Sequence, residues 1–374
     1  MKDTLMHFDL DIPTRIVFGA GTLDRVGPLT RELGERPLLV TGRSAGRRFG
    51  YLERALASLG GAVHFDGVSP NPACAEVDEA ARVARDHGCD VVVGLGGGSP
   101  LDAAKAVAAV LGTGRPATEL IGTTLSPTDP VVPIVAVPTT AGSGSEVTKG
   151  AIVTDTVRRF RSGIRGDALT PRIAVIDPDL TSTVPHHVRT ETAFDAFAHA
   201  VEGFVARRSD PLSQALAVQA LGLITEHADA LAKREDSPRA REALALAALL
   251  GGINVARAST CLPHRLQQAM GALPGLGISH GRGLAVVYPA WLRHTERHAP
   301  DDFGRLSQAL GTSSVGEAVG EFLDRAGLAS RLRDHGVARA DLGLLLEGVS
   351  GNLDNDPRPG VDAEYLQVLY EESY

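Results

Sequence analysis

The feature of the sequence that most constrains the fold lies at residues 91–105, where an apolar run leads into consecutive glycines and then into a helix-like stretch. The apolar run has the length and the Val content of a buried strand, and Pro100 suits the first turn of a helix, where its missing N–H costs nothing. Gly97 and Gly98, with Ser99, leave free backbone N–H groups at the positive end of that helix. The segment predicts a strand–turn–helix unit able to hold a diphosphate, although a glycine-rich turn that binds nothing has the same pattern.

Short apolar runs and helical segments alternate through the first half of the chain. The runs lie at residues 37–40, 62–65, 90–95, 131–137 and 172–176. They are apolar at consecutive positions, as expected for parallel strands that are covered on both faces. Later stretches, such as 211–232 and 239–258, are rich in Ala and Leu at helical spacing. We therefore expect a dinucleotide-binding α/β domain with a parallel sheet over residues 1–178 and an α-helical domain over residues 179–374.

Charge and cysteine usage restrict the partners and the location. The net charge of −8 disfavours a nucleic-acid partner, because such proteins usually gather Lys and Arg on one face. Cys74, Cys89 and Cys261 are widely spaced, so we expect reduced core thiols rather than disulfides or a cysteine zinc site. The start of the chain holds no long apolar run, so we expect no signal peptide, no membrane anchor and a cytoplasmic location. A small molecule is the expected substrate.

A second polar segment, residues 138–146, follows the apolar run at 131–137. It reads Pro-Thr-Thr-Ala-Gly-Ser-Gly-Ser-Glu, and its hydroxyls and glycines suit contacts with the sugar and nicotinamide of a nucleotide. A Ser/Thr-rich connecting loop without a ligand is the alternative.

Four side chains suggest a metal site. Asp195 and His199 are four residues apart in a helical stretch and therefore share one face of the helix. His264 and His280 follow later in the chain. Three imidazoles and one carboxylate would form a four-ligand site suited to Zn²⁺ or Fe²⁺. An Asp/His pair at this spacing is by itself an ordinary helix-face contact, so only the combination of four carries the prediction.

Together these motifs resemble the iron-containing (group III) alcohol dehydrogenase family over essentially the whole chain. The matching motifs are GGGSPLDAAK at 96–105, PTTAGSGSEVT at 138–148, DPDL at 177–180, DAFAHAVE at 195–202 and HG at 280–281. The resemblance implies a dehydroquinate synthase-like fold, with an all-α C-terminal metal-binding domain and the active site in the cleft between the two domains. It also implies hydride transfer between a nicotinamide cofactor and an alcohol or aldehyde, assisted by a metal acting as a Lewis acid.

The resemblance assigns roles to individual residues. One divalent metal, Fe²⁺ or Zn²⁺, would be bound by Asp195, His199, His264 and His280. The diphosphate would lie at Gly97, Gly98 and Ser99, and the rest of the cofactor at Asn71, Asp102, Thr139, Thr140, Ser143 and Thr148. We also expect a homodimer or a larger homo-oligomer.

Three departures from the family pattern bear on the chemistry. Gln268 stands where many members have a second His, four residues after the third metal ligand, so a group associated with proton transfer is absent. The loop between His264 and His280 is longer than in many relatives. Arg161 takes the place of a cofactor-binding Lys, which retains the charge but changes its geometry.

The residues after the first apolar run bear on the choice of cofactor. NAD-preferring relatives tend to have an Asp at the position of Gly42, where it would bind the ribose 2′-hydroxyl and repel a 2′-phosphate. Arg43 and Ser44 instead offer a cation and a hydroxyl. We therefore expect NADP(H) to be preferred over NAD(H), although a turn with exposed arginines is the alternative.

Two rival functions share the fold. A sugar-phosphate cyclase-like lyase would use NAD transiently, and Arg257, Arg265 and Arg282 near His264 leave an anionic substrate open. A maleylacetate-reductase-like enzyme typically lacks the Asp ligand, so Asp195 argues against it. For a dehydrogenase, the arginines suggest a small, polar or acidic alcohol or aldehyde. We expect the substrate pocket to be lined by Leu262, Pro263, Leu266, Gln267 and the loop 271–277.

Overall fold

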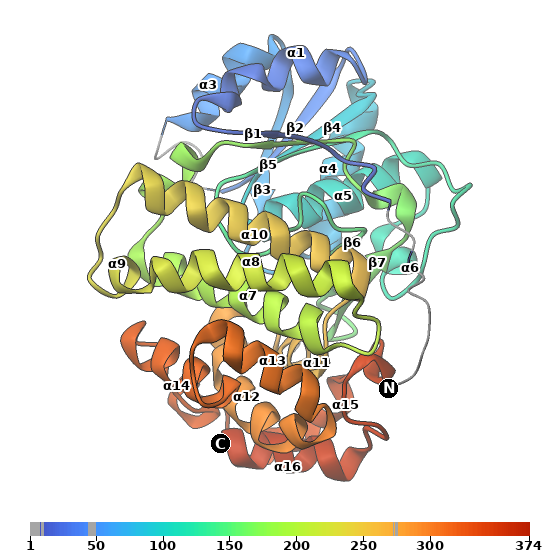
Figure 1. Cartoon of the computed structure of the whole chain (residues 1–374). Helices are drawn as coiled ribbons and strands as arrows, with labels where there is room; N and C mark the ends of the chain where they lie inside the picture. Colours follow the sequence, from blue (N-terminus) through green and yellow to red (C-terminus); the bar gives the residue numbers. More distant parts are fainter. Residues whose placement is uncertain (1–7, 9–10, 44–49, 272, 274–275) are drawn as a thin grey trace.

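A six-stranded parallel sheet forms the centre of the N-terminal half in this computed structural model, which describes residues 8, 11–43, 50–271, 273 and 276–374 (Figure 1). The strands are β1 (Arg15–Phe18), β2 (Pro37–Gly42), β3 (Val63–Val68), β4 (Val91–Gly96), β5 (Ile134–Pro138) and β8 (Ile173–Ile176). Their order in the sheet is β1-β8-β5-β4-β2-β3, and every pairing is parallel. The predicted α/β half with a parallel sheet is confirmed.

Helices cover both faces of this sheet. They are α1 (Val26–Arg31), α3 (Tyr51–Leu59), α4 (Cys74–Asp86), α5 (Gly98–Thr113) and the short α6 (Ala117–Leu120). Because side chains alternate along a strand, Leu38 and Val40 of β2 pack with α4 and α5, whereas Leu39 packs with α1 and α3 on the opposite face. This two-sided burial explains why the strands are apolar at consecutive positions.

Two parts of the sheet region were not predicted. The strand β1 and the antiparallel hairpin of β6 (Gly150–Asp155) and β7 (Phe160–Arg165) are short and carry polar residues among their apolar ones. The run predicted at 131–137 starts as a strand only at Ile134, after Pro133, whose ring nitrogen cannot donate to a neighbouring strand. The hairpin matters for function because β7 contacts the helix that carries His264.

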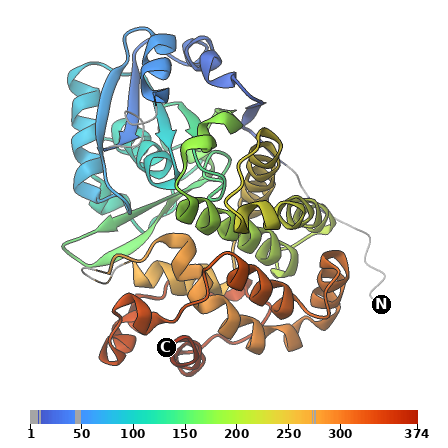
Figure 2. The ribbon, with the colours of Figure 1, turned by 90° about the vertical axis from the view of Figure 1, so that its left-hand side faces the viewer.

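The C-terminal half is helical, as predicted, and packs along one side of the sheet half (Figure 2). Its helices are α7 (His186–Val205), α8 (Pro211–Glu226), α9 (Ala228–Ala232), α10 (Pro238–Ala258), α11 (Leu262–Met270), α12 (His280–Thr295), α13 (Pro300–Leu310), α14 (Val315–Arg325), α15 (Leu342–Gly348) and α16 (Ala363–Ser373). The helical stretch predicted at 211–232 is two helices, because the chain leaves helical geometry at His227. The exact domain boundary at residue 178 stays a prediction.

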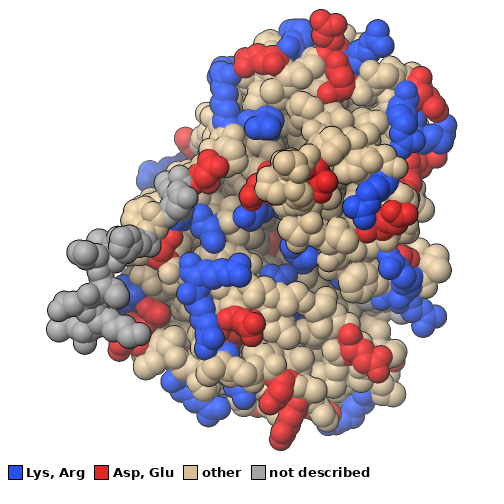
Figure 3. All heavy atoms as spheres, turned by 90° about the vertical axis from the view of Figure 1, so that its right-hand side faces the viewer, with Lys and Arg blue, Asp and Glu red and all other residues tan. Residues whose placement is uncertain are grey.

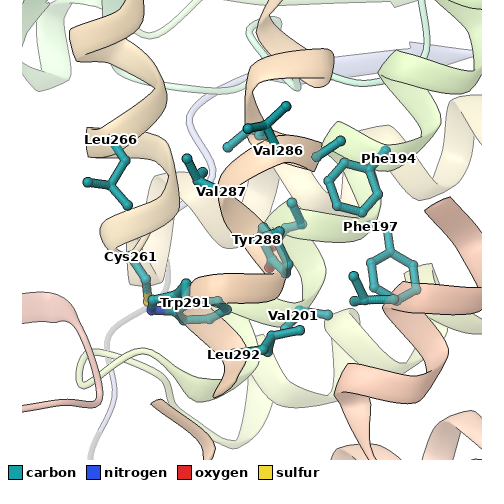
Figure 4. Close-up of a cluster of buried hydrophobic side chains, with 14 of the residues drawn as sticks. Phe194, Phe197, Val201, Cys261, Leu266, Val286, Val287, Tyr288, Trp291 and Leu292 are labelled. Atoms are coloured by element: carbon teal, nitrogen blue, oxygen red, sulfur yellow. The ribbon is translucent and has the colours of Figure 1, made fainter. Parts of the chain in front are cut away.

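The core of the helical half fixes the position of α7. Phe194 contacts the ring of Tyr288 edge to face, with ring centroids 5.4 Å apart, and Tyr288 contacts Trp291 at 5.1 Å (Figure 4). All three side chains are fully buried. Since α7 packs this aromatic face into the core, its neighbours Asp195 and His199 are held on a rigid helix rather than on a loop.

Two further predictions concern cysteines and membrane segments. Cys74, Cys89 and Cys261 are buried free thiols, as expected. Among the described residues, no single helix is long and apolar enough to cross a membrane; only α10 and α11 taken together, with a bend of 101° between them, meet the length and composition criteria.

Candidate active site

Four side chains from three helices converge on one point. Asp195 and His199 come from α7, His264 from α11, and His280 is the first residue of α12. The Nε2 atoms of His199 and His264 each lie 3.5 Å from Asp195 Oδ1, and Nε2 of His280 lies 3.3 Å from it. The structure thus brings together all four residues that the sequence singled out.

The atoms at the centre of this cluster lack partners. Asp195 Oδ1 and His264 Nε2 are buried and have no hydrogen-bond partner among the described residues. Unpaired buried polar atoms are costly, so their convergence calls for a bound group. Candidate ligand atoms of Asp195, His199 and His264 all lie within 4.8 Å of one another, and imidazole nitrogens with a carboxylate oxygen suit Fe²⁺ or Zn²⁺. These residues therefore fit a divalent metal.

Two side chains behind the cluster orient the imidazoles. Glu202 is fully buried, and its two oxygens lie 2.8 and 2.9 Å from Nδ1 of His264. Gln267 Oε1 accepts a hydrogen bond from Nδ1 of His280. With the proton held at Nδ1, Nε2 of each ring is left to face the cluster. Neither role was predicted from the sequence: Gln267 was expected only as a pocket wall, and Glu202 was not singled out, although it lies two turns after Asp195 on the same helix.

The electrostatics of the cluster favour an ionised carboxylate. Burial opposes the charge of Asp195, but the neighbouring imidazoles, first His199 and then His280 and His264, hold its pKa well below the usual value. Burial also disfavours charge on His264, yet Glu202 and Asp195 together raise its pKa to about 9, so a cation bound at Nε2 would have to displace the second ring proton. Burial lowers the pKa of His199 to about 4, against the attraction of Asp195. Asp195 is thus kept in the form that binds a cation.

The glycine turn follows β4 as expected. Gly96 has a φ of +152°, and a Cβ on it would lie 2.6 Å from Cγ of Pro100, so only glycine fits there. Gly97 is the N-cap of α5 and supplies no side-chain cap. The first N–H groups of α5 are therefore available to an anion.

The segment 138–148 lies against this turn and is held by two charged side chains, the buried Lys105 and the partly exposed Asp102. Lys105 Nζ donates to the carbonyl oxygens of Ser145, at 3.0 Å, and Thr148, at 3.3 Å, and also to that of Gly150. Asp102 accepts hydrogen bonds from Ser145 Oγ at 2.5 Å and from the backbone N–H of Ile152 at 2.9 Å. Asp102 thus holds the segment through Ser145 and the neighbouring strand β6 through Ile152.

A close contact joins this segment to the helical half. Gly144 has a φ of +61°, and a Cβ on it would lie 2.3 Å from Cα of Gly252 in α10. Only a pair of glycines allows the two backbones to approach so closely. The polar segment therefore packs between the sheet and α10.

A cleft of about 520 Å³ contains both the metal-ligand candidates and most of the residues expected to bind cofactor. It is lined by Asp195, His199, His264 and His280, and by Asn71, Gly98, Ser99, Asp102, Thr140, Ser143, Thr148 and Arg161. Gly97 and Thr139 lie immediately behind this lining, where Thr139 N–H donates to Gly96 O at 2.9 Å.

The residues expected to select the cofactor lie at the end of β2. Gly42 is next to the first turn of α5, since a Cβ on it would be 3.6 Å from Cγ of Pro100. The exposed guanidinium of Arg43 donates to Gly67 O and forms an ion pair with Glu76 at 2.9 Å. Ser44 lies outside the described residues.

The prediction for the pocket walls on α11 was wrong. Leu262 and Leu266 point into the hydrophobic core, whereas His264, Arg265 and Gln268 line the cleft. The spacing of apolar residues on a helix that is buried on all sides does not say which face meets a ligand. The loop expected to be longer lies partly outside the described residues, at 272 and 274–275.

Comparison with known proteins supports the family resemblance. Residues 13–178 match the family model for iron-containing alcohol dehydrogenase, and residues 189–372 match that for the C-terminal part of the Fe-containing alcohol dehydrogenase family. The chain is 30% identical to the NAD-dependent methanol dehydrogenase of Bacillus methanolicus (96% of this chain and 98% of the relative). It is 32% identical to the 4-hydroxybutyrate dehydrogenase of Cupriavidus necator (98% and 97%).

A solved structure agrees over nearly the whole length. The alcohol dehydrogenase of a halo-thermophilic archaeon from a Red Sea brine pool superposes with a TM-score of 0.93 at 28% identity, covering 99% of this chain and 100% of the other. The family models, the relatives and the fold agree. The chain belongs to the iron-containing alcohol dehydrogenase family, oxidoreductases that act on CH–OH groups.

Proposed function

We propose that the chain is a metal-dependent alcohol dehydrogenase or aldehyde reductase that transfers hydride between NADP(H) and a small, polar or acidic alcohol or aldehyde. One observation carries the proposal: Asp195 Oδ1 and His264 Nε2 are buried and unpaired in the same cleft as the open N-terminus of α5. A cation and a dinucleotide bound there would meet each other inside the cleft.

In this proposal Asp195, His199, His264 and His280 hold one Fe²⁺ or Zn²⁺. Such an ion would supply Lewis acidity toward the substrate oxygen, and a nicotinamide bound in the cleft would supply or accept the hydride. The N–H groups of Gly98 and Ser99 would hold the diphosphate.

The remaining cofactor contacts would come from Asn71, Thr140, Ser143, Thr148 and Arg161, which line the cleft, with Thr139 behind them. Asp102 would act by holding the segment that carries Ser143 and Thr148. Gln268 neither gains nor loses a proton near neutral pH, so it positions groups and does not relay protons.

The experiment that tests this function is the near-ultraviolet absorbance of reduced nicotinamide during turnover with short aldehydes. A dehydrogenase consumes one cofactor per aldehyde, and the absorbance falls permanently. A sugar-phosphate cyclase-like lyase would convert its substrate with no net change in absorbance, and a maleylacetate-reductase-like enzyme would reduce maleylacetate in preference to saturated aldehydes. Either result would replace the proposed function.

NADP(H) preference is proposed from the surroundings of Gly42. No carboxylate occupies that position, and the exposed guanidinium of Arg43 lies beside it, where it would have to be shared between Glu76 and a 2′-phosphate. A side chain at residue 42 has room, because a Cβ there would lie 3.6 and 3.7 Å from its nearest neighbouring atoms. One relative, the methanol dehydrogenase of Bacillus methanolicus, is named as NAD-dependent, so the proposed preference would set this chain apart from that relative.

Gly42→Asp is therefore expected to lower the ratio of kcat/KM for NADPH to that for NADH by about tenfold or more, because a carboxylate there repels a 2′-phosphate. Gly42→Asn has the same size without the charge and is the matched control. Steady-state kinetics with both cofactors measure the ratio. An unchanged ratio in Gly42→Asp, or an equal shift in Gly42→Asn, would argue against NADP(H) selection at this position.

The cellular form proposed is a cytoplasmic homodimer or larger homo-oligomer that acts on a small molecule. Gel filtration coupled to light scattering measures the assembly. A monomer at micromolar concentration would contradict this part of the proposal.

A further inference from the structure

The arginines around His264 differ in how their charges are balanced. Arg257 forms an ion pair with Asp210, and Arg282 forms one with Glu191 at 3.3 Å. Arg265, the residue after His264, makes no ion pair with any described carboxylate. Its side chain is nonetheless only 6% exposed and lines the cleft. A buried cation with neutral partners alone is costly unless a ligand supplies the counter-charge.

The contacts of Arg265 leave part of its guanidinium unused. Nη2 donates to Thr260 Oγ1 at 2.8 Å and Nη1 to Gln268 Oε1 at 3.2 Å, whereas Nε has no partner among the described residues. An arginine can only donate, so the amide oxygen of Gln268 must face it. The NH₂ group of Gln268 is then left as a second donor in the same cleft.

A second arginine, on β7, lines the same cleft as Arg265. Arg165 is partly buried, donates to Gly163 O at 3.0 Å and makes no ion pair with a described residue. The strand β7 packs against α11. Like charges gathered in this way attract an anion.

The acidic residues of the cleft do not neutralise this pair. Asp102 is engaged by Ser145 and Ile152, Glu191 by Arg282, and Asp195 by the histidine cluster. A further donor, Nδ2 of Asn352, is buried in the cleft lining without a partner among the described residues. Lys and Arg side chains also border the hollow between the two halves on the face shown in Figure 3.

We propose that Arg265 and Arg165, with the NH₂ groups of Gln268 and Asn352, form a subsite for an anionic group of the substrate. The substrate is then a short aldehyde or alcohol with a carboxylate, phosphonate or sulfonate at its other end. This inference rests on the proposed function, because it places the reacting carbon at the cluster around Asp195. Arg265 follows His264 on α11, so the anion and the reacting oxygen lie near each other and the carbon chain between them is short.

The subsite is separate from the place of the cofactor phosphates. The diphosphate is expected at the start of α5, whereas Arg265 and Gln268 belong to α11 beside the candidate metal ligands. Hydride transfer requires the nicotinamide end of the cofactor near those ligands, and this places its phosphates away from them. An anion at Arg265 therefore belongs to the substrate.

The test compares matched aldehydes: succinate semialdehyde with pentanal, and phosphonoacetaldehyde and sulfoacetaldehyde with propanal. We expect kcat/KM to be about 100-fold higher for the best anionic aldehyde than for its neutral partner, as for a buried charge pair. The three anions distinguish carboxylate, phosphonate and sulfonate. Equal or higher kcat/KM for the neutral aldehydes would overturn the proposal.

Arg265→Met keeps the aliphatic stem and removes the charge, and Arg165→Met does the same on the less buried residue. Each is expected to lower kcat/KM for the anionic aldehyde about 30-fold or more and to leave the neutral aldehyde within about threefold. Lys149→Met is the matched control, because Lys149 lines the cleft but is paired with Asp167. Equal losses for both aldehydes, or a raised KM for NADPH with an unchanged KM for the aldehyde, would contradict the subsite.

Binding separates failure of the subsite from failure of the proposed function. Succinate is an unreactive dianion, and it should raise the melting temperature of the wild-type protein more than 1,4-butanediol does. Arg165→Met should abolish that difference, and so should Arg265→Met where it folds. Succinate binding without turnover of any aldehyde would reject the function and keep the subsite, whereas turnover without selective succinate binding would reject the subsite alone.

Discussion

Asp195→Ala is expected to remove the bound metal and to lower kcat for aldehyde reduction by about 1,000-fold or more, since a Lewis acid contributes several kcal/mol to the barrier. Asp195 Oδ1 lies within 3.5 Å of Nε2 in three histidines, so its loss leaves imidazoles with no anion to balance a divalent cation. Metal content by mass spectrometry and steady-state kinetics measure the two effects.

Asp179→Ala provides the control for Asp195→Ala. Asp179 is about half exposed and pairs with Arg241 at 3.6 Å, away from the cleft lining. It should keep both metal and rate. If Asp195→Ala retained stoichiometric metal and a rate near that of the wild type, Asp195 would not be a metal ligand.

Lys105→Met is expected to lower the free energy of unfolding by about 3 kcal/mol, as for breaking a buried charge pair from one side. Its ammonium is buried, lies 3.5 Å from Asp102 and donates to carbonyl oxygens in the segment 145–150. Methionine fills the space but leaves Asp102 without its counter-charge and these carbonyl oxygens without their donor. Urea denaturation measures the change, and KM for the cofactor should rise because the segment that carries Ser143 and Thr148 loses its anchor.

Lys149→Met is the control for this change. Lys149 pairs with Asp167 at 2.9 Å, and both side chains are more than half exposed, so its loss should change the free energy of unfolding by about 0.5 kcal/mol at most. Equal stabilities of the two variants would show that Lys105 does not hold the segment.

Local sequence patterns predicted the parts of the molecule that depend on short stretches. The consecutive apolar positions of β4 and the glycines after it define a buried strand and an open helix N-terminus without reference to distant residues. The four-residue spacing of Asp195 and His199 likewise placed them on one helix face. His264 and His280 were added to them as metal-binding residue types and through the family resemblance, because nothing in their spacing shows that α11 and α12 meet α7.

Contacts between distant segments could not be predicted. Arg257, Arg265 and Arg282 look alike in the sequence, and only the folded chain shows that Asp210 and Glu191 balance two of them. The role of Glu202 depends on α11 bringing His264 to within 2.8 Å of it. The hairpin that carries Arg161 and Arg165 could not be predicted as a pair of strands, because its sequence shows no strong alternation of apolar and polar residues. Its strands are buried by packing of β6 against α5 and of β7 against α11.

The sequence also could not predict which way the side chains of a buried helix point. All residues of α11, apolar and polar, are buried, so their hydrophobicity does not indicate which face of the helix lines the cleft. The walls expected from Leu262 and Leu266 therefore proved to be core. Arg265 and Gln268 line the cleft instead, so this wall carries hydrogen-bond donors where an apolar surface was expected.

The central claim is that a divalent metal held by Asp195, His199, His264 and His280 is required for hydride transfer. The most direct test measures cofactor oxidation by protein whose metal has been removed with a chelator and verified as absent, and then by the same protein after addition of Fe²⁺ or Zn²⁺. We expect less than about 1% of the original rate without metal and recovery with one equivalent of a divalent ion. Full activity in verified metal-free protein would contradict the claim.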